Sequence, residues 1–112
     1  MKIKTTEMYN ALLIDLKGNM MGGEETKEFS DTLHKAIDEG KLNVVVDLAE
    51  VKFMNSSGLG MLISGLTTMK KAGGNMRLAR VTDRIESLLV ITKLISIFEN
   101  YESVEEAVQS FK

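Results

Sequence analysis

The architecture of this chain can be worked out from residues 44–60, which run VVVDLAEVKFMNSSGLG. Three successive β-branched valines, between Asn43 and Asp47, are typical of a strand buried on both faces, so we expect this strand in the middle of a sheet. Two serines and two glycines follow within residues 56–60. Such residues favour turns and helix starts, so the segment predicts a strand, a loop and a helix in immediate succession.

The helix that follows is predicted from about Ser57 to Ala72, because its apolar residues recur at helical spacing and Gly73-Gly74 can end it. Upstream, alternating apolar residues at 3–5 and 9–17 predict an opening hairpin. A first helix should carry the stripe Phe29, Leu33, Ala36 and Ile37.

The remainder of the chain continues to alternate strands and helices. We expect a strand that covers 76–78 and can extend to Val81, then a helix around 85–89, a last strand at Ile97-Phe98 and a closing helix at 104–111. The order β-β-α-β-α-β-α-β-α predicts an α/β fold: one mixed sheet with an N-terminal hairpin and parallel crossovers covered by helices. With 112 residues, no proline and no repeat, residues 1–112 are predicted to form a single domain.

The composition excludes several classes of function. Hydrophobic residues make up 44% and charged residues 27%, and the net charge is −2, so the basic stripe of a nucleic-acid binder is missing. There is no cysteine, which fits a reducing cytoplasm and excludes thiolate metal sites. The first residues lack the apolar core of a signal peptide, and the uncharged stretch 53–69 has too many polar residues and glycines for a membrane span. We therefore expect a cytoplasmic protein without a membrane or nucleic-acid partner.

Few residues of the sequence could support enzyme catalysis. The only histidine is His34, so no metal-ligand set can be assembled around it, and a serine relay would require His34 to reach Ser56. The glycines at 58 and 60 match neither a dinucleotide fingerprint nor a P-loop. We expect no cofactor, no metal and no catalytic residue.

Residues 55–60 admit two interpretations. In the first, Ser56 or Ser57 merely caps the helix by accepting a bond from a free first-turn amide. In the second, a serine hydroxyl held at a helix start beyond a strand end is a good substrate for a kinase, and a phosphate there would repel a docked partner. The residues alone leave both open.

The same residues resemble a known family. The run at 44–48, then 51–60, then Lys70-Lys71-Ala72-Gly73-Gly74 before a strand, resembles the STAS domain of bacterial anti-sigma factor antagonists. The resemblance covers most of the chain, and it implies the STAS fold. It also implies a protein that is not an enzyme: unmodified, it binds an anti-sigma factor that is also a serine-protein kinase, and so frees a sigma factor.

The resemblance further implies particular site residues. The phosphorylated serine of the family maps onto Ser56, and the partner-binding edge onto Asn55, Ser57, Gly58 and Leu59. A serine phosphatase would reverse the modification, and the protein is expected to be a monomer. Asn55 stands where the family usually has aspartate, and the loop at 18–23 has no acidic residue. These departures motivate the alternative of a constitutive STAS scaffold subunit, in a signalling or transporter-associated complex, without a phosphoswitch.

Overall fold

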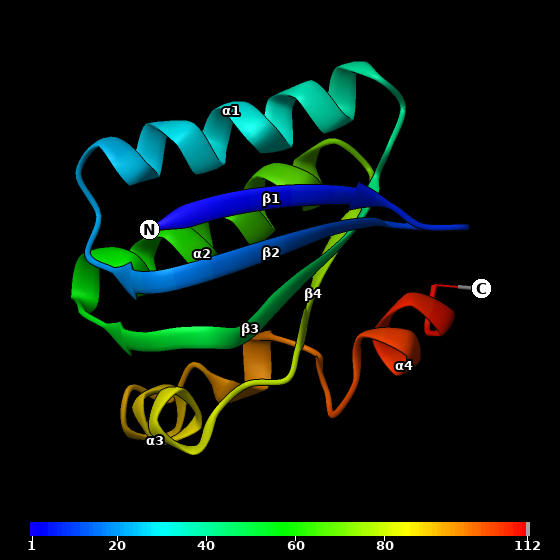
Figure 1. The fold of residues 1–112 in the computed structure, drawn as a ribbon. Coiled ribbons are helices and arrows are strands. Elements are labelled where there is room, and N and C mark those ends of the chain that lie inside the picture. The colour runs from blue at the N-terminus through cyan, green and yellow to red at the C-terminus, as the bar shows by residue number, and fades with distance from the viewer. Residues whose placement is uncertain (112) are drawn as a thin grey trace.

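The computed structural model, which describes residues 1–111, contains one mixed sheet of five strands in the order β1-β2-β3-β4-β5 (Figure 1). The strands are β1 (Lys2–Glu7), β2 (Leu12–Met20), β3 (Asn43–Met54), β4 (Asn75–Ala79) and β5 (Asn100–Tyr101). β1 pairs antiparallel with β2, and the other neighbours pair in parallel. The predicted α/β class and opening hairpin are confirmed.

The helices are α1 (Glu24–Asp38), α2 (Ser56–Lys71), α3 (Asp83–Ile91) and α4 (Val104–Gln109), with a 3-10 turn η1 (Ile95–Ile97). In Figure 1, α1 and α2 lie together on one side of the sheet, and α4 lies away from them near the C-terminus. Two apolar clusters follow from this arrangement. The larger receives buried side chains from α1, α2 and α3, and the smaller those of α4.

β3 is buried on both faces, as its valines predicted. Val44 and Val46 belong to the larger cluster, and Val45, which points the other way, belongs to the smaller. This alternation follows from the two-residue period of a strand. Because β3 is central and longer than its neighbours, its C-terminal end projects toward the start of α2 (Figure 1).

The predicted last strand at Ile97-Phe98 is wrong. Residues 95–97 form η1, and the strand that pairs with β4 is Asn100–Tyr101. The physical reason is that Phe98 is buried in the larger cluster, so this apolar run packs into the core and the strand pairing passes to the more polar residues after it.

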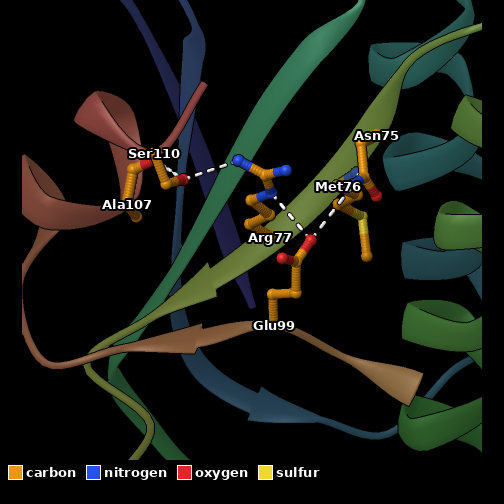
Figure 2. Close-up of polar contacts among 6 residues, drawn as sticks. All are labelled: Asn75, Met76, Arg77, Glu99, Ala107 and Ser110. Carbon is orange, nitrogen blue, oxygen red and sulfur yellow. Dashed lines mark hydrogen bonds and ion pairs between the residues drawn. The ribbon is translucent and has the colours of Figure 1, made fainter. Parts of the chain in front are cut away.

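The short C-terminal helix is held by Arg77 on β4 (Figure 2). The Nε of Arg77 donates to Glu99 Oε2 at 2.9 Å, and its Nη1 donates to Ser110 Oγ at 2.7 Å. The guanidinium of Arg77 also lies 4.2 Å from the centre of the Phe111 ring. Ser110 Oγ in turn donates to the carbonyl of Ala107 at 2.5 Å. One side chain thus joins β4, the approach to β5 and the end of α4.

Candidate functional site

The predicted site residues come together where β3 ends and α2 begins. In Figure 1 the C-terminal ends of β2 and β3 lie at the same side of the sheet, beside the first turn of α2. Ser56 and Ser57 are exposed, whereas Gly58 is buried and Leu59 is only 6% exposed. The Ser56 side chain is therefore open to a modifying enzyme, and the Leu59 side chain is part of the core.

The helix cap is Asn55, and the expectation that Ser56 or Ser57 caps α2 is wrong. Asn55 has an extended backbone, with φ −97° and ψ −176°, and its side chain accepts a hydrogen bond from the Gly58 amide at 2.8 Å. Asparagine is among the best capping residues, and the helix begins one residue earlier than predicted. Both serines consequently lie inside the first turn, and neither of them is used as the cap.

The loop after β2 packs directly on this helix start. A Cβ atom at Gly58 would lie 2.1 Å from the carbonyl oxygen of Met20, and one at Gly22, where φ is +87°, would lie 2.6 Å from Ser57 Cβ. Only glycine permits such close approaches. The loop and the first turn of α2 therefore form one continuous surface.

Two large apolar side chains near the ends of β2 and β3 are half exposed: Met21 at 47% and Phe53 at 42%. Their neighbours Met20 and Met54 are paired between β2 and β3, and both side chains lie in the core. Because successive side chains of a strand point to opposite faces, Phe53, which precedes Met54, points away from that core. Sequence reasoning missed the exposure of Phe53. The alternation around Met54 was the available indication.

The two segments that meet at Ser56 contain no charged residue, although the Glu25 carboxylate of α1 accepts from the Met21 amide at 3.3 Å. Neither residues 18–23 nor residues 53–69 contain Asp, Glu, Lys, Arg or His. Exposed methionine and aromatic side chains with few charges are typical of protein interfaces. We call the surface formed by Met21, Gly22, Asn55, Ser56 and Ser57 the switch surface.

The arrangement offers no support for catalysis. His34 is exposed on α1, and its Nδ1 lies 2.8 Å from the carbonyl oxygen of Ser30 on the same helix, a local contact that does not involve Ser56. Within residues 1–111, no group of three or more His, Cys, Asp or Glu side chains could hold a metal ion. Over the same residues, no helix has the length and apolarity needed to cross a bilayer.

The carboxyl groups with perturbed pKa values lie elsewhere, around Asp47 on β3. Burial disfavours the charge of Asp47, but hydrogen bonds from Arg80 and the Ala49 amide outweigh it and hold its pKa below the usual range. Asp15, the register partner of Asp47 on β2, has a raised pKa because of burial and the neighbouring Asp47 carboxylate. This carboxylate pair is a second polar cluster, separate from the switch surface.

Comparison with known proteins covers nearly the whole chain. The sequence profile of the STAS domain matches residues 2–107. The anti-sigma-B factor antagonist of Staphylococcus epidermidis is 32% identical over 89 residues, which are 76% of this chain and 82% of that protein.

Two solved structures share the fold at lower identity. One is an anti-sigma-factor antagonist (STAS) domain protein from Planctomyces limnophilus, with a TM-score of 0.80 and 21% identity over 97% of each chain. The other is the Bacillus cell fate determinant SpoIIAA in its phosphorylated form, with a TM-score of 0.76 and 16% identity over 99% of this chain and 100% of that one.

Proposed function

Since the chain belongs to the STAS domain family, we propose that it is an anti-sigma factor antagonist whose affinity for its partner is controlled by phosphorylation of Ser56. Unmodified, it binds an anti-sigma factor through the switch surface, which the buried Gly58 and Leu59 support from below at the start of α2. Binding frees the sigma factor, and the protein itself catalyses nothing. This role belongs in the cytoplasm, where transcription takes place in bacteria.

The observation that carries the proposal is an exposed serine on a surface that also exposes Met21 and whose own side chains carry no charge. A partner that covers these side chains desolvates no charge of theirs, although the Glu25 carboxylate accepts from the Met21 amide beside them. The name of the 32% identical relative, an anti-sigma-B factor antagonist, supplies the class of partner.

The magnitudes fit a switch that acts on the complex and not on the fold. A phosphoserine adds roughly −1.5 to −2 charges, and the positive end of α2 favours it by about 0.3–1 kcal/mol, so the domain stays folded. Burying an unpaired phosphate against a partner costs several kcal/mol, and about 1.4 kcal/mol already lowers affinity tenfold. Modification should therefore release the partner.

The modification is a phosphoryl transfer with a nucleoside triphosphate as the donor. The Ser56 oxygen forms a bond to the terminal phosphorus on the anti-sigma kinase, the nucleoside diphosphate leaves, and the hydroxyl proton passes to a base of the kinase. A serine phosphatase restores the hydroxyl by transferring the phosphoryl group to water.

The test compares Ser56→Asp with Ser56→Ala in binding to the purified cognate anti-sigma factor. We expect Ser56→Ala to bind like the wild type and Ser56→Asp at least about tenfold more weakly. Ser64→Asp is the matched control, because it adds the same charge to another exposed serine of α2. Equal affinities of both Ser56 variants would refute the switch.

A constitutive scaffold subunit is the second candidate, and the presence of Asn55 and of an uncharged loop at 18–23 favours it. The two functions differ in the state of Ser56 in the cell. Mass spectrometry of the protein purified from its native source should detect a phosphate on Ser56 if the switch operates, and none under any growth condition if the chain is a scaffold.

A further inference from the structure

Asn55 joins three separate backbone groups at the switch surface. Its Oδ1 accepts from the Gly58 amide at 2.8 Å, its Nδ2 donates to the Met21 carbonyl at 3.1 Å, and its backbone amide donates to the Met20 carbonyl at 3.2 Å. The first bond lies within α2, and the other two reach the end of β2 and the loop after it. One residue therefore caps the helix and ties the loop to it.

We infer that Asn55 is a positioning residue: its side-chain amide fastens the Met21 carbonyl to the start of α2, so that Met21 and Ser56 are presented to a partner as one preformed surface. That a partner binds this surface rests on the function proposed above. The attachment of the loop to the start of α2 does not depend on that function. The hydrogen bond from Asn55 Nδ2 to the Met21 carbonyl is called the latch.

The loop has a second attachment that makes the latch effective. The Met21 amide donates to Glu25 Oε2 at 3.3 Å, so the peptide groups on both sides of Met21 are held, one by α1 and the other by Asn55. Beyond Met21 the loop turns through Gly22 and Gly23, both with positive φ, and Gly22 abuts Ser57. The half-exposed Met21 side chain thus extends from a backbone that is fixed at both of its peptide groups.

The latch requires the chemistry of an amide. Asparagine has an acceptor for the Gly58 amide and two donor hydrogens, one of which reaches the Met21 carbonyl. An ionised aspartate accepts only, so it could keep the cap but would turn an oxygen toward the Met21 carbonyl oxygen. Serine could also keep the cap, and it is neutral, but it lacks the amide donor.

A fastened loop lowers the cost of binding. A flexible Met21 segment would have to be ordered when a partner docks, and the side chain and backbone entropy lost would reduce the affinity. With the latch closed, that ordering has already occurred in the free protein. Asn55 therefore contributes to partner affinity without having to touch the partner.

The experiment measures amide hydrogen exchange by NMR in the full chain for wild type, Asn55→Asp, Asn55→Ser and Asn55→Ala. The Gly58 amide reports the cap, and the Met21 amide reports the order of the loop. We expect Asn55→Asp and Asn55→Ser to keep Gly58 protection while Met21 exchanges about fivefold faster, the effect of one ordinary hydrogen bond. Asn55→Ala should accelerate exchange at both amides.

Urea unfolding of each variant separates local from global effects. Met21 exchange within twofold of the wild type in both Asn55→Asp and Asn55→Ser would overturn the latch, as would acceleration that merely follows a lower global stability.

A binding measurement distinguishes this inference from the proposed function. If Ser56→Asp binds the anti-sigma factor like the wild type while the exchange pattern appears as expected, the switch fails and the latch stands.

Discussion

The guanidinium of Arg80 forms two hydrogen bonds with the buried carboxylate of Asp47, from Nε to Oδ1 at 3.1 Å and from Nη2 to Oδ2. Asp47 is 3% exposed, whereas the Arg80 side chain is 49% exposed. Arg80 also has a left-handed backbone, with φ +52°, and its amide donates to the Tyr101 carbonyl at 2.9 Å. The ion pair therefore lies directly after β4, and it stabilises a backbone conformation of Arg80 that non-glycine residues seldom adopt.

Removing Arg80 should destabilise the fold, and removing Asp47 as well should add less than its own separate effect. Arg80→Ala leaves a buried carboxylate without its cation, and we expect a loss of roughly 1–3 kcal/mol, moderated by water entering at the half-exposed site. Urea unfolding of Arg80→Ala, Asp47→Asn and the double variant forms a complete cycle. The double variant should be less destabilised than the sum of the singles. Additive effects would mean that the two side chains do not interact.

The carboxylate pair predicts opposite pH dependences for its two members. The pKa of Asp15 is raised by burial and by Asp47, so Asp15 destabilises the fold at neutral pH and this penalty disappears as the pH falls through its folded pKa. The pKa of Asp47 is lowered, so its contribution is present above the unfolded value and is lost as the pH falls through the folded one.

Asp15→Asn tests this assignment. The variant should be more stable than the wild type at pH 7, by about 0.2–1 kcal/mol, the usual effect of like charges on neighbouring strands. The difference should shrink as the pH falls through the raised pKa of Asp15, since the wild-type carboxyl then takes up its proton. Thermal unfolding between pH 7 and pH 4 measures it, and a difference independent of pH would contradict the raised pKa.

Two glycines of α2 should respond oppositely to alanine. At Gly58 a Cβ would lie 2.1 Å from the backbone oxygen of Met20, so Gly58→Ala must move β2 or the helix and should cost about 1–3 kcal/mol or more. At Gly60 nothing described lies within 4 Å of a Cβ, so Gly60→Ala should stabilise by about 0.5–1 kcal/mol through helix propensity. Chemical denaturation of both variants checks the pair. A neutral Gly58→Ala would show that the close approach is absent in solution.

Arg77 should control the attachment of α4 (Figure 2). Arg77→Ala removes the bonds to Glu99 and Ser110 and the contact with Phe111, and we expect about 1–2 kcal/mol of lost stability. Hydrogen exchange should accelerate more at Ala107 and Val108 than in β3. Arg77→Lys is the control for charge, because it keeps the cation but not the forked geometry, and it should restore only part of the protection.

Much of the fold could be predicted because the deciding interactions are local. The alternation in β1 and β2, the valine run of β3, the apolar stripe of α2 and the glycines at 73–74 act within a few residues. Periodicity and turn residues therefore identified these elements and their order. The prediction failed at Ile97-Phe98, where a short apolar run suits a strand or a core-facing turn equally well. Only packing decided between them.

The same distinction applies to the switch surface: part of it could be predicted from the sequence, and part depends on the tertiary structure. The amino-acid order alone brought out the Asn55–Gly60 segment, the absence of charge around it and the resemblance that singles out Ser56. That Asn55 reaches the Met21 carbonyl and that Gly58 packs on the Met20 carbonyl depend on how β2 and β3 are aligned. Residues more than thirty positions apart meet there, and no local pattern encodes that distance, so tertiary structure had to supply it.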